Sequence, residues 1–266
     1  MRVRDIPQAS TTFVVGDIHF DLHHRNAWEA FVRCVWETNP DEIVINGDFL
    51  DFGMLSRYPQ DAGDPLHAIE QIKVFVSELR RITERAGKIT VIEGNHDERW
   101  YKITSSVPPE TLKGAMGLSL REQCLHHGMS PSVNWIREAT NLRGYRVGTY
   151  LIRHGHKQQG RFGGPMHIAA NRLNKNNGQS EIVGHHHRAQ LFCRTAGGKT
   201  AVAIASPCMA RQMNYALDPD WQLGFVAIES APKFSTAYPV IMDDDGAFCF
   251  RGHIYDGRKL MQRRKR

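Results

Sequence analysis

Five short clusters of the sequence contain aspartate, histidine and asparagine, whose side chains bind metal ions and transfer protons. The clusters are Asp17-x-His19, Gly47-Asp48-x-x-Asp51, Gly94-Asn95-His96-Asp97, His154-Gly155-His156 and Gly184-His185-His186-His187. Taken singly, each is more simply explained as a polar surface loop. Together they indicate one shared site. Carboxylate, imidazole and amide ligands of this mixed hardness suit Mn²⁺, Fe or Zn²⁺ better than Ca²⁺, which prefers all-oxygen sites.

The clusters hold more ligands than one ion accepts. A set of about seven suits two ions that share a carboxylate and a water. Each cluster follows an apolar, β-branched run that is typical of a buried strand. The strands are expected at residues 11–15, 42–45, 89–92, 145–153 and 181–183.

Two stretches with helical spacing, 28–36 and 69–82, separate the first three expected strands. The order β-α-β-α-β predicts a parallel sheet with helices against it. Ligands gather beyond the carboxyl ends of the strands in such sheets, so the clusters are expected to converge at one edge.

The rest of the chain is less regular at first and then rich in strands. We expect a helical insert at approximately 100–143. From 190 onward we expect a hairpin-like pattern, with a turn at Gly197-Gly198 and a last strand at 247–254. We predict an α/β fold with two packed mixed β-sheets flanked by helices. Residues 1–257 form a single domain in this prediction, followed by a basic tail at 258–266.

The motifs D-x-H, G-D-x-x-D, G-N-H-[DE], an isolated His and G-H-x-H occur in full and in order between residues 12 and 188. In this the chain resembles the calcineurin-like metallophosphoesterases. The resemblance implies the four-layer α/β/β/α sandwich of that family. It also implies two metal sites with a bridge between them, formed by Asp17, His19 and His187 at one metal, Asn95, His154 and His185 at the other, and Asp48 as the bridging ligand.

Other roles are implied at neighbouring positions. The family pattern favours His154 as the ligand of its cluster and leaves His156 as a contact to the site or substrate. His186 holds the variable position and is expected to point away from its neighbours. Asp51 resembles a residue that orients the site, with direct metal binding left open.

The implied reaction is hydrolysis of a phosphate ester. Two cations about 3.5–4 Å apart activate a bridging water, so no protein nucleophile is needed. His96 resembles the family's general acid, with Asp97 orienting its imidazole; the alternative is a structural histidine.

Candidate substrate contacts follow the ligand clusters. Three arginines are candidates to clamp a phosphate, with a solvated surface role as the equal alternative: Arg57, Arg99 and Arg188. Three aromatic residues are candidates to stack on a base, with packing favoured instead: Tyr58, Trp100 and Tyr101.

The family's protein serine/threonine phosphatases typically continue the second motif with Arg-Gly and use G-N-H-E. Here the second motif continues with Phe52-Gly53 and the third ends in Asp97, which disfavours a protein phosphatase. We favour a phosphodiesterase, with nucleic acid or nucleotides as candidate substrates. The alternatives are a phosphomonoesterase and a non-catalytic binding module; the latter is disfavoured because every expected position is filled.

Composition adds weaker evidence. The net charge of +6 favours polyanionic partners, but residues 258–266 alone supply six positive charges. This tail is either a disordered end or a contact to nucleic acid. The chain lacks an apolar run of about 18 residues and a signal peptide, and its five cysteines form no C-x-x-C pair. We therefore expect a cytoplasmic protein without a membrane partner. Two Mn²⁺ ions are the expected cofactors, with Fe, Zn²⁺, Co²⁺ or Ni²⁺ as alternatives; the oligomeric state is not predicted.

Overall fold

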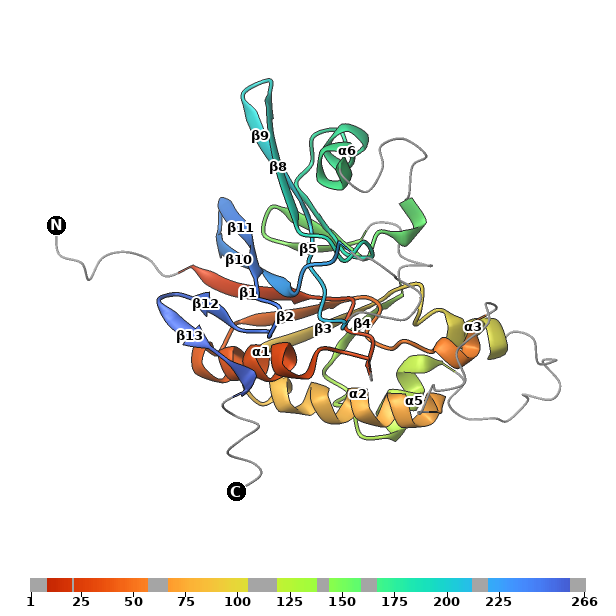
Figure 1. Cartoon of the computed structure of the whole chain (residues 1–266). Helices are drawn as coiled ribbons and strands as arrows, with labels where there is room; N and C mark the ends of the chain where they lie inside the picture. The colour runs from red at the N-terminus through yellow and green to blue at the C-terminus, as the bar shows by residue number, and fades with distance from the viewer. Residues whose placement is uncertain are drawn as a thin grey trace.

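The computed structural model describes residues 9–20, 22–56, 67–104, 119–137, 144–158, 167–211 and 220–258. Within them, two large mixed sheets pack face to face, and helices cover the outer face of each (Figure 1). The predicted α/β architecture is confirmed. None of the described helices is both long and apolar enough to cross a membrane.

The first sheet has the order β11-β10-β1-β2-β3-β4. Its members are β1 (Ser10–Val15), β2 (Glu42–Asn46), β3 (Lys88–Glu93), β4 (Asn134–Arg137), β10 (Gly224–Ala231) and β11 (Phe234–Ile241). Strands β1 to β4 run parallel, whereas β10 is antiparallel to β1. The parallel part brings three of the ligand clusters to one edge.

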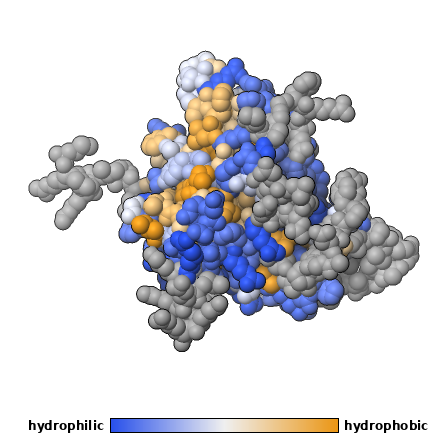
Figure 2. Space-filling view, in the orientation of Figure 1, coloured by the Kyte–Doolittle hydropathy of each residue, from blue (hydrophilic) through white to orange (hydrophobic). Residues whose placement is uncertain are grey.

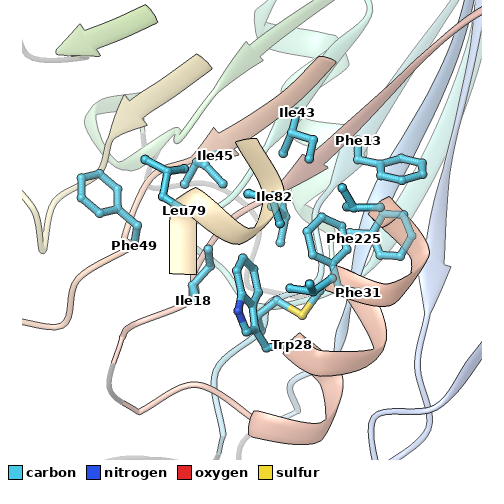
Figure 3. Packing of buried hydrophobic residues seen from close by; sticks show 14 of the residues in the cluster. Phe13, Ile18, Trp28, Phe31, Ile43, Ile45, Phe49, Leu79, Ile82 and Phe225 are labelled. Carbon is cyan, nitrogen blue, oxygen red and sulfur yellow. The ribbon is translucent and has the colours of Figure 1, made fainter. Parts of the chain in front are cut away.

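Helices α1 (Arg25–Thr38) and α2 (Ala68–Thr83) cover the outer face of this sheet (Figure 1). Helix α1 begins where the His24 side chain accepts a hydrogen bond from the Ala27 amide, and it ends at Asn39, whose φ is 44°. Its apolar side packs on the sheet because Phe31 meets Phe13 and Phe225 in a fully buried aromatic cluster (Figure 3). Burying each such ring contributes about 1.5–3 kcal/mol.

Three shorter helical segments lie near the carboxyl edge or beside α2. They are η2 (Gly53–Leu55), α3 (Arg99–Thr104) and α5 (Leu120–His126). Helix α3 continues directly from the third ligand cluster, so its first residue lies beside the site.

The second sheet has the order β5-β6-β7-β9-β8. Its strands are β5 (Tyr145–Val147), β6 (Tyr150–Arg153), β7 (Glu181–Val183), β8 (Gln190–Ala196) and β9 (Lys199–Ala205). Helix α6 (Ile168–Lys175) packs on its outer face, and the short η3 (His156–Gln158) follows β6. A separate hairpin consists of β12 (Phe248–Phe250) and β13 (His253–Tyr255).

Side chains alternate between the two cores along each strand. On the first sheet, Phe13 and Val15 face the helices, while Val14 faces the second sheet. The layer between the sheets is formed mainly by β-branched residues, including Val14, Val44, Ile152, Ile182 and Ile204. The buried β-branched runs in the sequence reflect this double coverage.

Three predicted segments differ from the structure. The strand expected at 145–153 is two strands, because Gly148 adopts a φ of 53° and turns the chain after Val147. The region 100–143 is not only helical, since β4 pairs in parallel with β3 and extends the first sheet. The strand expected near 247–254 is the β12–β13 hairpin. Arg57, Tyr58 and tail residues 259–266 lie outside the described residues.

Candidate metal centre

The five ligand clusters lie at the carboxyl ends of β1, β2, β3, β6 and β7. Backbone hydrogen bonds join the first two loops, since the Asp17 amide donates to the Gly47 carbonyl over 3.0 Å and the Ile18 amide to the Asp48 carbonyl over 2.9 Å. The His185 amide donates to Oδ2 of Asp17 over 2.9 Å, which links the second sheet to the first. The predicted convergence at one edge is present.

One group of candidate ligands consists of Asp17, His19 and His187, whose ligand atoms lie within 4.8 Å of one another. Nδ1 of His19 lies 3.2 Å from Oδ1 of Asp51. Because Nδ1 donates to this carboxylate, Nε2 carries the lone pair. That Nε2 atom is buried and has no hydrogen-bond partner in the described structure, as a metal-binding imidazole requires.

A second group consists of Asp48, His154 and His185, again within 4.8 Å. Nε2 of His154 lies 3.2 Å from Oδ2 of Asp48 and 3.2 Å from Oδ1 of Asn95. Its Nδ1 lies 2.9 Å from the Asn46 carbonyl oxygen, which fixes the ring and leaves Nε2 as the ligand atom. Asn95 therefore lies beside this group.

Asp48 belongs to both sides of the centre. Its carboxylate lies within 4.8 Å of ligand atoms of His154 and His185, and also of His19 and His96. A carboxylate in this position fits a bridge between two ions. The structure thus brings all seven predicted ligands together, and the donor set fits two divalent cations.

The charge states of Asp48 and His185 also fit metal binding. Burial disfavours ionisation of Asp48, but the neighbouring imidazoles of His154 and His96 outweigh it and hold the pKa of that carboxyl well below its usual range. Burial lowers the pKa of His185 to about 3, which keeps its ring neutral. Ionised carboxylates and neutral imidazoles are the forms that bind metal.

Five of the seven candidate ligands have a left-handed backbone. The φ angles are 49° for Asp17, 51° for His19, 47° for Asp48, 72° for His185 and 59° for His187. Such a conformation costs of order 1 kcal/mol or more for a residue with a Cβ, and such strain concentrates at functional sites. The surrounding strands and loop hydrogen bonds hold these residues there.

The glycines of the motifs allow the loops to approach closely. A Cβ on Gly47 would collide with the His154 ring, and one on Gly94 would collide with the Asp48 carboxylate. These two positions therefore need glycine for steric reasons.

His96 lies next to the first group, with its ring centroid 4.5 Å from that of His19. Its Nδ1 is 2.9 Å from the carbonyl oxygen and 3.2 Å from Oδ1 of Asp51. Its Nε2 is 3.2 Å from Nη2 of Arg99, whose Nη1 donates to the Asp51 carbonyl over 2.9 Å. Asp51 therefore orients both His19 and His96.

The prediction that Asp97 orients His96 is wrong. Asp97 is fully buried, and its carboxylate accepts hydrogen bonds from the Leu50 amide over 3.0 Å and the Gly94 amide over 2.7 Å. The tight turn at 95–98 directs this side chain into the fold rather than toward the imidazole. Asp97 thus ties the second ligand loop to the third.

The remaining predicted contacts are spread around the site. Nε2 of His156 lies 3.3 Å from Oε1 of Glu98, and its ring is 5.3 Å from that of His154. Nε of Arg188 lies 3.7 Å from Oδ2 of Asp220. The two aromatic candidates that the structure describes follow the packing alternative: Trp100 stacks on Phe52, and Tyr101 donates to Glu93.

With this geometry in place, the match to known proteins is decisive. Residues 10–198 match the family model of the calcineurin-like phosphoesterases. The chain belongs to this family. Its members depend on metal ions, and the groups around Asp48 are where this member offers ligands.

Relatives include two bacteriophage proteins. The gene 54 protein of Mycobacterium phage D29 is 25% identical over 260 residues, covering 91% of this chain and 97% of the relative. The gene 54 protein of Mycobacterium phage L5 is 24% identical over 230 residues, covering 81% and 87%.

Solved structures similar to this chain include Vps29 from Chaetomium thermophilum. It has 12% identity and a TM-score of 0.48, and the match covers 94% of this chain and 100% of Vps29. The purple acid phosphatase PPD1 of yellow lupin has 11% identity and a TM-score of 0.43, covering 94% of this chain and 53% of the phosphatase.

Sequence patterns missed one residue of this phosphoesterase site. The Trp221 ring lies 4.3 Å from that of His187 and packs, like Leu22, against the buried pair Cys208 and Ala210. The Gln222 amide donates to the His187 carbonyl over 3.0 Å, which holds this segment against the ligand loop. No local motif marks Trp221, so only the fold reveals it.

Proposed function

We propose that this chain is a dinuclear phosphodiesterase. The observation that carries the proposal is the pair of candidate ligand groups that share Asp48, with His96 beside them. When bound, the two ions would supply Lewis-acid activation of water and of the phosphoryl oxygens. Mn²⁺ is the proposed metal, with Fe, Zn²⁺, Co²⁺ and Ni²⁺ as alternatives.

His96 is the proposed general acid. Asp51 contacts Nδ1 of this imidazole at 3.2 Å through its carboxylate, so Nε2 is the nitrogen that would take up a proton from solvent and then pass it to the leaving oxygen. Arg99 contacts that nitrogen at 3.2 Å. A substrate phosphate would attract the guanidinium and leave Nε2 facing the leaving group.

The charges at the rim favour a diester over a monoester. Lys157 pairs with Glu98 at 2.7 Å, and Arg188 faces Asp220 at 3.7 Å. Arg99 also follows a ligand cluster, but it donates to the backbone carbonyls of Asp51 and Phe52 rather than to a carboxylate. A diester phosphate carries one negative charge and a monoester nearly two at neutral pH. Among the residues that the structure describes, so little uncompensated positive charge at the rim suits the singly charged substrate.

Nucleic acid and nucleotides are the proposed substrate class, and the basic tail a proposed contact. The one described residue of that tail, Arg258, pairs with Asp256 at 2.9 Å and with Asp245. Its charge is therefore compensated within the chain. Any electrostatic contribution of the tail to nucleic acid binding would come from residues 259–266. The cytoplasmic location stays a prediction.

The test compares bis-p-nitrophenyl phosphate with p-nitrophenyl phosphate in the presence of each candidate metal. We expect kcat/KM for the diester to exceed that for the monoester by about tenfold or more. The opposite ranking would support the phosphomonoesterase. Metal-loaded protein that turns over neither ester would support the binding module. Cyclic nucleotides, single- and double-stranded DNA and RNA then define the substrate.

A further inference from the structure

The two large sheets leave four outer strands, and three of them are protected. Proteins protect such edges with short strands, charges or proline, because free backbone groups there pair with other chains. Strand β5 has three residues and β4 has four. Strand β11 has eight, but it contains Pro239. Hydrogen-bonded and non-bonded pairs alternate along β10 and β11, starting from the bonded pair Ala231 and Phe234 at the turn. Pro239 falls at a non-bonded pair, so its nitrogen points outward, where proline offers no donor to another chain.

Strand β8 lacks these protections. It has seven residues, no proline and one charged side chain, Arg194. Every residue from Leu191 to Ala196 is exposed, with Leu191 47% and Phe192 42% accessible. The β8–β9 hairpin projects from the rest of the molecule (Figure 1), and apolar surface lies below its paler tip (Figure 2).

The turn determines which backbone groups of β8 face outward. Gly197 and Gly198 have φ angles of 56° and 73°, which form a two-residue hairpin turn. Such a turn closes on a hydrogen-bonded pair, here Ala196 with Lys199, and bonded pairs then alternate along the strands. The outward N–H and C=O groups therefore belong to Leu191, Cys193 and Thr195.

We propose that β8 pairs antiparallel with β8 of a second copy of this chain, in the register centred on Cys193. The three outward residues are spaced evenly about Cys193, so this register uses all of them from both copies. Cys193 then faces Cys193 of the second copy, and Leu191 faces Thr195. A shift of two residues in either direction loses part of this ladder.

The side chains are self-complementary in the same register. Phe192 faces Arg194 of the second copy, which places a guanidinium beside an aromatic ring twice across the two-fold axis. Arg194 is the strand's charged residue, so no like charges face each other within β8. One patch serves both copies, as an isologous interface requires.

The pairing joins two five-stranded sheets into one continuous ten-stranded sheet. It uses no candidate ligand, because β8 begins three residues after His187 and its outward groups lie from Leu191 onward. The inference is therefore independent of the proposed hydrolysis. An extended segment of a different protein is the alternative occupant, and the assembly state distinguishes the two.

The test is sedimentation velocity of the full chain from about 1 to about 200 µM, the concentration range in which two copies with a small interface would associate. We expect a monomer–dimer equilibrium. Cys193→Lys places two ammonium groups opposite each other and should weaken association at least tenfold. Cys249→Lys changes the other exposed cysteine, on β12, and should leave it unchanged. A monomer throughout this range, or a dimer insensitive to Cys193→Lys, overturns the proposal.

Cross-linking gives a second readout that needs no charged variant. Hydrogen-bonded residues in antiparallel strands lie about 5.5 Å apart at Cα, within disulfide range. Mild oxidation or a short bis-maleimide should link the wild-type chain and Cys249→Ser as dimers, but not Cys193→Ser. Equal linking of both serine variants contradicts the register. Circular dichroism and Tm of each variant confirm folding.

Discussion

The backbone amide of His96 donates a 2.8 Å hydrogen bond to Oδ1 of Asp48. The candidate acid and the candidate bridging carboxylate are therefore joined directly, without an intervening side chain. Ligand atoms of Asp48 and His96 also lie within 4.8 Å of each other, so an ion bound by Asp48 would lie close to the His96 imidazole. This relationship leads to the first two predictions.

Asp48→Asn should remove the bridge and reduce kcat by about a thousandfold or more, because a neutral amide would replace the carboxylate that the two ions share. Metal content by plasma mass spectrometry should fall with activity. Asp244→Asn, at an exposed loop position, is the matched control and should change neither. Near-normal turnover by Asp48→Asn would refute the assigned centre.

His96→Ala should keep its metal and lose about a hundredfold or more in kcat for alkyl esters, which need a proton on the leaving oxygen. The loss should be much smaller for p-nitrophenyl esters. The measurement is kcat over a series of leaving-group pKa values. His126→Ala changes an exposed histidine on α5, and its kcat for every ester of the series should equal that of the wild type. An equal loss for every ester argues against the acid role.

Asp97→Ala should destabilise the protein, because the Leu50 and Gly94 amides would lose their buried acceptor. Each unsatisfied amide costs about 1–3 kcal/mol. Urea unfolding measures the loss. Asp51→Asn is the informative contrast: it should lower kcat about 10–100-fold by loosening His19 and His96, with a smaller effect on unfolding. If Asp97→Ala instead unfolds like wild type, its role in joining the loops is wrong.

Glu181→Gln should destabilise β7, which leads into the last ligand cluster. Glu181 is 1% exposed and accepts two hydrogen bonds from Arg172, at 2.8 and 2.6 Å. Removing one partner of a buried pair costs about 3–5 kcal/mol. Thermal unfolding should show a lower Tm, whereas Glu229→Gln at a surface pair with Arg251 should change it little.

The strands and their order followed from the sequence where local pattern decides the structure. The runs ending at Val15, Ile45 and Ile92 are buried on both faces, so their composition alone marks them as strands. The rule that ligands gather at carboxyl ends then placed the clusters together. Strand β4 was not predicted, because its four residues are only partly buried and do not form such an apolar run.

Side-chain direction and distant contacts could not be predicted in the same way. The spacing of Gly94-Asn95-His96-Asp97 does not reveal that the last carboxylate turns inward to two amides. Trp221 contacts His187 although the two lie 34 positions apart in the sequence, and packing of the whole fold decides that contact. Such features depend on tertiary structure and leave no local pattern.

The left-handed backbone at the ligand positions limits how this centre can be redesigned. Among residues with a Cβ, asparagine, aspartate and histidine tolerate positive φ best. Five candidate ligands, including Asp17 and His187, stand at such angles. Replacing them with cysteine or glutamate to change metal preference would add a backbone penalty to any gain in affinity. Engineering of metal choice should therefore start at neighbours such as Asp51 and Trp221, which adjust the ligands without occupying a left-handed position.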